Sequence, residues 1–307
     1  MSIQDKLKII QSLSGLTQTE IAYKIGVSFV AFNNWWTDKA KPRKKQEDKI
    51  DEMYKKYTGQ KEIPASILIA KKKILAKKSE KFKNILKILL KNSDIYDQFL
   101  LSLTYNSNKI EGSTLSEDET ADILFNNTSI PNKSIVEQLE VKNHQTSLQY
   151  LFQHLSSNGK IDEDLILKLH SILMNGIIFN AGIYRSHGVR IVGSNVPTAN
   201  YLKVPILMKN IIKDINKKYN DSINHVSRIH AEFERIHPFS DGNGRVGRML
   251  LTAMLLKNNF APAVILQEEK RIYYICLRKA QLQDDFSLLE EFIVEAIENG
   301  LKIVDRK

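Results

Sequence analysis

Apolar residues recur at intervals of three and four along most of the chain, a spacing that predicts helices rather than strands. A helix over residues 224–236 shows it most clearly, because its inward positions are Val226, Ile229, Phe233 and Ile236. Pro238 ends that helix, and a second apolar face begins near Asn243. The pattern therefore predicts a mostly helical, all-α protein in which a short loop joins these two helices.

One segment departs from the helical pattern. Residues 184–205 contain β-branched Val189, Ile191 and Val192, followed by turn-forming residues at positions 193–195. Strand formers that border a turn predict a β-hairpin, the single one expected in the fold.

The first 60 residues contain two short predicted helices. Thr17 and Glu20 form a capping box for a helix that stops at Gly26, and Ser28 caps the next one. In the second helix we expect Val30 and Trp35 to point inward. Two helices joined in this way resemble the helix-turn-helix of Cro/cI-type repressors, over residues 1–60. The resemblance implies a DNA-facing set: Gln18, Ser28, Phe29, Asn33 and Asn34.

The charge distribution supports nucleic-acid binding by this end of the chain. Residues 1–91 hold 21 Lys and Arg against 9 Asp and Glu, whereas the remainder holds 24 against 26. A basic run follows the second helix, where it could contact phosphates: Lys39, Lys41, Arg43, Lys44 and Lys45. A solvated lysine-rich surface, or an inert docking domain of three helices, explains the same features. Both alternatives stay open.

Residues 61–98 read as a basic connector with one amphipathic helix over residues 70–92. No apolar run approaches the roughly 18 residues of a membrane span, and the start of the chain has no signal-peptide pattern. The single cysteine, Cys276, cannot form an internal disulfide. We therefore expect a cytoplasmic protein without a membrane partner.

The loop within IHPFSDGNGRVGRML, residues 236–250, carries the clearest chemistry. Gly242 and Gly244 let successive backbone amides converge at the start of a helix, which makes a site for phosphates. Arg245 and Arg248 add two planar donors for the outer phosphates of a nucleotide. The loop therefore predicts a nucleotide site, although it is not a Walker loop.

Two further side chains in the loop suit group transfer. Asp241 is a single carboxylate, appropriate for a Mg²⁺ ion that takes its other ligands from phosphates and water. His237 is mostly neutral at pH 7 and can accept a hydroxyl proton. Together these residues predict phosphoryl or nucleotidyl transfer to an alcohol.

The run HPFSDGNGRVGR resembles the signature of the Fic family, His-x-Phe-x-Asp/Glu-Gly-Asn-Gly-Arg-x-x-Arg, at every specified position. The resemblance implies protein AMPylation, in which a Ser, Thr or Tyr hydroxyl attacks the α-phosphate of ATP. It makes His237 the general base, Asp241 the metal ligand and Phe239 the anchor of the loop. It also implies a set that holds the phosphates: Gly242, Asn243, Gly244, Arg245 and Arg248.

The same resemblance extends to segments outside the loop. The predicted hairpin corresponds to the Fic flap, which would line the ATP with Val192, Gly193, Ser194 and Asn195. Tyr273 and Tyr274 match paired tyrosines beside the nucleotide. Gln281 stands where the family often has an adenine-contacting Asn, a departure that leaves base selectivity open.

Residues 107–112, SNKIEG, resemble the inhibitory motif of the family in its N-terminal version. Ser107 and Glu111 are four apart and share a helix face, and Gly112 is a natural helix stop. A glutamate brought to Arg248 would occupy the guanidinium meant for the γ-phosphate. The motif therefore implies an enzyme that is off by default.

The sequence thus predicts three parts: a helix-turn-helix domain over residues 1–60, a connector over 61–98 and a Fic domain over 99–300. The expected activity is Mg²⁺-dependent transfer of AMP from ATP to a hydroxyl of a target protein or of the chain itself. AMP removal, transfer of another group, or a DNA-binding regulator that senses nucleotide are the alternatives. A zinc hydrolase is disfavoured, because His170, His187 and His230 make no ligand spacing with His237. A homodimer stays open.

Overall fold

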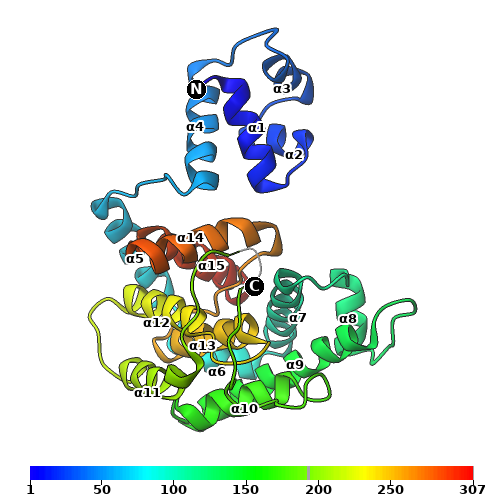
Figure 1. The fold of residues 1–307 in the computed structure, drawn as a ribbon, viewed down its shortest axis with the longest axis vertical. Coiled ribbons are helices and arrows are strands. Elements are labelled where there is room, and N and C mark those ends of the chain that lie inside the picture. The colour runs from blue at the N-terminus through cyan, green and yellow to red at the C-terminus, as the bar shows by residue number, and fades with distance from the viewer. Residues whose placement is uncertain (192–193, 307) are drawn as a thin grey trace.

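The computed structural model describes residues 1–191 and 194–306, and these residues form helices and loops without a strand (Figure 1). The mostly helical fold predicted from the sequence is confirmed. Val192 and Gly193, predicted to line the ATP, lie outside the described residues. Among the described helices, none combines the length and the apolar character needed to cross a bilayer.

The N-terminal unit, residues 3–58, consists of four helices that pack on one another: α1 (Ile3–Ser14), α2 (Gln18–Ile25), α3 (Phe29–Trp36) and α4 (Lys44–Thr58). The capping box predicted at Thr17 and Glu20 is present, and Gly26 ends α2 with a φ of 81°. Ser28 Oγ accepts a hydrogen bond from the backbone of Ala31 and so caps α3. The short helices thus begin and end where their local sequence requires.

One inward position predicted for α3 is wrong. Val30 is 69% exposed, whereas Phe32 and Trp35 are buried against the rest of the unit. Residues two apart on a helix point to nearly opposite sides, so burial of Phe32 turns Val30 toward solvent.

The connector contains two helices, α5 (Ala65–Ser79) and α6 (Ile85–Lys91), rather than the single helix predicted over residues 70–92. Asn84 caps α6 by accepting from the backbone of Lys87 at 2.8 Å. Asn259, distant in the sequence, accepts from the N–H of Ile85 at 3.0 Å and donates to Phe82 O at 2.8 Å. These side chains form hydrogen bonds with backbone groups that lose their helical partners between α5 and α6. The interruption between the two helices is therefore stable.

The remaining helices form the body of the molecule: α7 (Ser93–Glu111), α8 (Glu117–Phe125), α9 (Ile135–Ser156), α10 (Glu163–Leu173), α11 (Val204–Ile215), α12 (Ser222–Ile236), α13 (Asn243–Lys257), α14 (Lys270–Gln283) and α15 (Ser287–Val304). Two 3₁₀ turns, η1 (Tyr201–Lys203) and η2 (Gln267–Glu269), precede α11 and α14. Helix α13 is buried along almost its whole length, and α7, α9, α10 and α12 pack around it (Figure 1). The loop between α12 and α13 therefore leads into a helix that lies in the centre of the core.

The β-hairpin predicted over residues 184–205 does not form among the described residues. Thr198 Oγ1 donates to Val189 O at 2.7 Å, and Arg185 donates to His187 O and Ala199 O at 2.7 and 2.5 Å. Side chains thus satisfy carbonyls that a strand ladder would have used. Pro197 also lacks the N–H that a ladder needs, and an isolated two-stranded hairpin is marginal.

Candidate active site

A pocket of about 930 Å³ opens between the α12–α13 loop, the end of α7 and the face of α14. It brings together most of the residues predicted from the sequence: Glu111, Ser194, His237, Asp241, Gly242, Asn243, Gly244, Arg248, Tyr273, Tyr274 and Gln281. Ser107, Asn195 and Arg245 do not line it. The size lies within the range of nucleotide and cofactor sites.

His237 is held rigidly at the end of α12. It adopts a left-handed conformation with φ of 52°, its N–H donates to Phe233 O, and its carbonyl accepts from Arg185 Nε at 2.7 Å. Its Nδ1 lies 3.1 Å from Glu234 O, so Nδ1 carries the proton and Nε2 is free to accept one. Burial lowers the pKa of His237, although the hydrogen bond to Glu234 opposes the shift. The imidazole is therefore neutral at pH 7.

The side chain of Asn243 closes the loop onto itself. Its Oδ1 accepts from Phe239 N at 2.8 Å, and its Nδ2 donates to Phe239 O at 2.9 Å. The Phe239 ring is buried and stacks on His170 at a centroid distance of 3.7 Å, so it anchors the loop as expected. Asn243 therefore shapes the nest, and the backbone amides at the start of α13 are left to face a phosphate.

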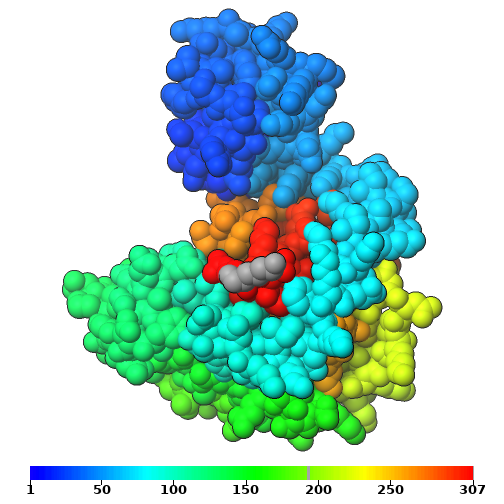
Figure 2. Space-filling model, turned by 180° about the vertical axis from the view of Figure 1, so that it is seen from behind, coloured from blue at the N-terminus to red at the C-terminus, as the bar shows by residue number. Residues whose placement is uncertain are grey.

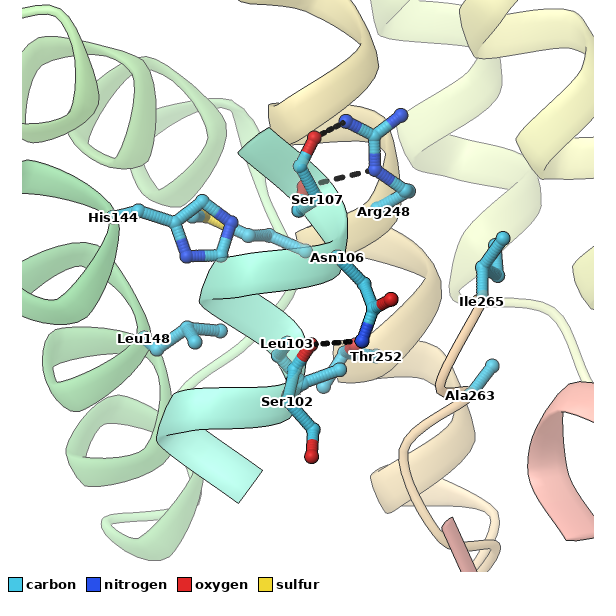
Figure 3. Close-up of a pocket in the computed structure, with 11 residues that line it drawn as sticks. Ser102, Leu103, Asn106, Ser107, His144, Leu148, Arg248, Thr252, Ala263 and Ile265 are labelled. Carbon is cyan, nitrogen blue, oxygen red and sulfur yellow. Dashed lines mark hydrogen bonds between the residues drawn. The ribbon is translucent and has the colours of Figure 1, made fainter. Parts of the chain in front are cut away.

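Arg248 is bound by the motif at the end of α7. Its Nη2 donates to Glu111 Oε1 at 2.6 Å and to Ser107 O at 3.1 Å, and its Nε donates to Ser107 Oγ at 2.9 Å. Figure 3 shows Ser107 facing the guanidinium, beside a cavity of about 20 Å³ that has room for one water. The two segments predicted to meet lie in direct contact.

Gly244, at the start of α13, leaves room for the contact between Glu111 and Arg248. A Cβ at Gly244 would lie 2.3 Å from Glu111 Oε1, so any larger residue would push the carboxylate away. Burial opposes ionisation of Glu111, but the charge and hydrogen bond of Arg248 outweigh it and hold the pKa below its usual range. The side chain keeps 32% of its surface accessible because it borders the pocket. Glu111 is thus an ionised group that faces the site.

Arg245 does not reach the pocket, contrary to the prediction that it grips a phosphate. Its side chain is 3% exposed, and its Nη1 donates to Glu140 Oε1 of α9 at 2.5 Å. Asp241 Oδ2 lies 3.9 Å from its Nη2. A buried arginine needs a partner, and the carboxylate of α9 provides one. Arg245 therefore ties the loop to α9.

Asp241 projects from the loop with 61% of its side chain accessible. Its Oδ1 accepts from Gly242 N at 2.6 Å, and its other oxygen faces solvent and Arg245. Within residues 1–191 and 194–306 no group of three His, Cys, Asp or Glu could hold a metal. An ion at Asp241 would take most of its ligands from phosphates and water, which fits Mg²⁺.

Two of the three histidines considered for zinc, His170 and His230, have other partners. His170 Nε2 donates to Asp241 O at 3.1 Å, and its Nδ1 accepts from Gly182 N at 2.7 Å. Burial lowers the pKa of His170 to about 4. His230 Nε2 lies 2.6 Å from the hydroxyl of Tyr273. These rings support the loop and α14 rather than a metal.

On α14, the two tyrosines differ in their access to the pocket. Tyr273 is fully buried and bonded to His230, whereas Tyr274 is 38% exposed. Gln281 donates to Ala231 O at 2.9 Å, which leaves its oxygen free. Tyr274 and Gln281 therefore present the more available groups.

The sequence prediction missed Glu234, which also lines the pocket. It is 7% exposed, and its Oε1 is buried without a hydrogen-bond partner. A Cβ at Gly247 would lie 2.3 Å from that oxygen, so Gly247 makes room for it. Burial raises the pKa of Glu234 to about 7, despite the opposing charge of Arg248. Its one signal in the sequence was its position one helical turn before His237.

Basic side chains that line the pocket were missed as well: Arg190, Lys270, Arg271 and Arg278. In the N-terminal unit, the residues predicted to face DNA vary in accessibility. Ser28 and Phe29 are exposed, whereas Gln18, Asn33 and Asn34 are half-buried.

Comparison with known proteins finds similarity to the family that the loop motif resembles. Residues 160–255 match the Fic/DOC family model. The protein adenylyltransferase Fic of Drosophila willistoni is 29% identical over 203 residues, covering 65% of this chain and 40% of that protein. The protein adenylyltransferase fic-1 of Caenorhabditis briggsae is 34% identical over 185 residues, covering 59% and 36%. The chain thus spans about two fifths of the length of these curated relatives.

Solved structures share the fold. Fic-1 from C. elegans superposes with a TM-score of 0.69 at 22% identity, over 93% of this chain and 84% of that one. A Fic-domain signaling protein from Bacteroides thetaiotaomicron gives a TM-score of 0.66 at 23% identity, over 76% and 97%. Residues 160–255 are thus similar to the Fic/DOC family, and this span contains the loop from His237 to Arg248.

Proposed function

We propose that this protein transfers AMP from ATP to a hydroxyl group of a target protein or of itself, and that Glu111 restrains the reaction. The observation that carries the proposal is one pocket in which His237, the amides at the start of α13 and Arg248 converge. The curated relatives that match 65% and 59% of the chain are named protein adenylyltransferases, which supports the same reaction.

In this reaction the hydroxyl oxygen of the target attacks the α-phosphorus of ATP. The bond to the bridging oxygen breaks, pyrophosphate leaves, and the hydroxyl proton passes to Nε2 of His237. The neutral ring and the bond from Nδ1 to Glu234 O prepare that nitrogen to accept. General-base catalysis of this kind contributes roughly 10² to 10⁴ to the rate.

Charge stabilisation comes from fixed groups. The start of α13 offers backbone amides and the positive end of a helix, and Arg248 offers a guanidinium for the outer phosphates. Asp241 is the residue that would hold Mg²⁺, which supplies charge neutralisation on the phosphates when bound. The protein thus positions ATP chiefly through a preformed electrostatic site.

Glu111 competes with the nucleotide for Arg248. A γ-phosphate needs the guanidinium that Glu111 now occupies at 2.6 Å, and the carboxylate would repel it. Removal of AMP, with Glu111 orienting a water, is the alternative that uses the same contacts. The balance between addition and removal depends on whether Glu111 is displaced.

Labelling with α-labelled ATP tests the proposal. Glu111→Gly protein should label itself or a lysate protein, and Glu111→Gly combined with His237→Ala should not. If the double variant labels equally, His237 is not the base and the mechanism above fails. Mass spectrometry of the labelled protein should show an added AMP on a Ser, Thr or Tyr.

As a second candidate function, we propose that the N-terminal unit binds DNA in the manner of a helix-turn-helix. The supporting observations are the three-residue connection between α2 and α3, the exposed start of α3 at Phe29, and the net positive charge of residues 1–91. The exposed basic run at residues 39–45 lies beside that helix, where it would contact phosphates.

Selection from random duplex DNA, followed by a mobility shift, tests this second function. Binding should weaken steeply with salt, and charge-neutral variants at Lys39 and Lys41 should weaken it for every sequence. Selection that enriches no sequence, with no shift at low salt, would exclude it.

A further inference from the structure

The N-terminal unit reaches the pocket that holds the catalytic loop. Leu13 near the end of α1, and Tyr57 and Thr58 at the end of α4, line the same pocket as His237 and Arg248. Figure 1 shows the ends of α1 and α4 directed at α14, and Figure 2 shows the unit seated against α14 from behind. Two parts that are far apart in the sequence therefore enclose one space.

Specific contacts hold α1 in this place. Arg271 Nη1 donates to Ser12 O at 2.8 Å and to Leu13 O at 2.7 Å. These carbonyls belong to the last turn of α1, where no helical N–H is available to them. Gly15 then ends the helix with a φ of 67°, and a Cβ there would lie 2.8 Å from Arg271 Nη2. The end of α1 thus fits closely around one side chain of α14.

The end of α4 is held in the same way. A Cβ at Gly59 would lie 3.1 Å from Ile275 Cγ2, and Gly59 has a φ of 72°. Just beyond it, Lys61 O accepts from Lys279 Nζ at 3.3 Å, and Lys61 Nζ pairs with Glu291 at 2.5 Å. Two helix ends are therefore fixed on α14 by different contacts.

The space that these helix ends enclose combines apolar and positive groups. Leu13, Tyr57 and Ile275 contribute apolar surface, and Arg271 and Arg278 contribute charge. A nucleoside triphosphate matches this combination, because it has a flat base and a polyanionic tail.

We propose that Leu13, Tyr57 and Thr58 are substrate-contacting residues, so that the N-terminal unit forms one wall of the ATP site and sets its affinity. The inference rests on the proposed function, since it assigns ATP to this pocket. None of the three residues belongs to the α12–α13 loop or to the start of α13, so their loss should weaken ATP binding and leave the chemical step unchanged.

The experiment compares Leu13→Ala with Val30→Ala, both in the Glu111→Gly background. Both side chains are apolar and partly exposed on the N-terminal unit, but only Leu13 lines the pocket. Leu13→Ala should raise the KM for ATP about fivefold with kcat within twofold, from the lost apolar contact. Val30→Ala should change neither. Tyr57→Leu and Thr58→Ala extend the test, because each removes part of the surface that lines the pocket and should raise the KM for ATP in the same way.

Direct binding of a fluorescent ATP analogue gives a second readout, independent of catalysis. Weaker binding by Leu13→Ala than by Val30→Ala supports the wall, whether or not the protein labels a target. Absence of labelling would count against the proposed function but not against the wall. Unchanged ATP affinity and KM in all three wall variants would overturn the inference. So would a rise confined to the KM for the protein target, which would assign the wall to the target instead.

Discussion

Substitution of Glu111 by glycine is the most direct perturbation of the site, because it removes the partner of Arg248 and leaves the catalytic loop intact. The bond between Arg248 Nη2 and Glu111 Oε1 is 2.6 Å long, and the arginine side chain is only 9% exposed. Hydrogen bonds to charged groups contribute about 1.5 to 3 kcal/mol. Since Glu111 keeps 32% of its surface accessible, we take about 2 kcal/mol.

This energy is what ATP must overcome when its γ-phosphate displaces the carboxylate. About 2 kcal/mol corresponds to roughly 30-fold in apparent affinity. At ATP concentrations below KM, the initial rate of labelling by Glu111→Gly should therefore exceed that of the parent by roughly 30-fold.

Two graded variants and one control define the cause. Glu111→Gln keeps an acceptor but loses the charge, so its rate should fall between parent and Glu111→Gly. Ser107→Ala removes the 2.9 Å bond to Arg248 Nε, worth about 1 kcal/mol, and should raise the rate about fivefold. Glu117→Gly, an exposed glutamate in the first turn of α8, should change nothing. Equal rates for parent and Glu111→Gly, or a matching rise in Glu117→Gly, would refute the reasoning.

Three further predictions concern single groups of the site. Burial lowers the pKa of His237, so the midpoint of the acid limb in the pH profile of kcat/KM should lie below pH 6.5. A midpoint above pH 6.5 would argue against His237 as the base. Asp241→Asn should raise the Mg²⁺ concentration needed for half-maximal labelling at least tenfold, measured by metal titration of the Glu111→Gly protein; an unchanged requirement would exclude Asp241 as the ligand. Burial raises the pKa of Glu234 from 4.5 to about 7, so its contribution to stability is lost as pH rises between these values. Glu234→Gln should therefore raise the free energy of unfolding at pH 8 by about 3 kcal/mol and leave it unchanged near pH 4.5, as denaturant titrations would show.

Features set by neighbouring residues were predicted well from the sequence. The capping box at Thr17 and the helix stop at Gly112 are both present, because a cap depends on residues three or four positions away. The helix expected from residue 224 runs from Ser222, within the usual uncertainty of helix ends.

Features that depend on residues far apart in the sequence were not predicted. The connector breaks where Asn259 supplies hydrogen bonds, and the side chain of Arg245 turns to Glu140; neither partner is near in the sequence. The expected hairpin does not form in the part of the chain that the structure describes, where Arg185 and Thr198 take the carbonyls that a strand would use. Periodicity contains no information on such pairs. The meeting of the two motifs was predicted only through the family resemblance.

Arg248 is the residue at which the proposed inhibition by Glu111 and the proposed binding of ATP compete. It is anchored in the buried helix α13, its guanidinium donates to Ser107 and Glu111, and the charge of buried Glu234 also acts on it. Because its backbone belongs to the buried core, we expect a phosphate to gain access when the Glu111 side chain, or the last turn of α7 that carries it, moves away. That turn ends at exposed Gly112, whose φ of 109° no other residue adopts easily. Release of inhibition is therefore expected to act on the end of α7, while α13 and the catalytic loop keep their geometry.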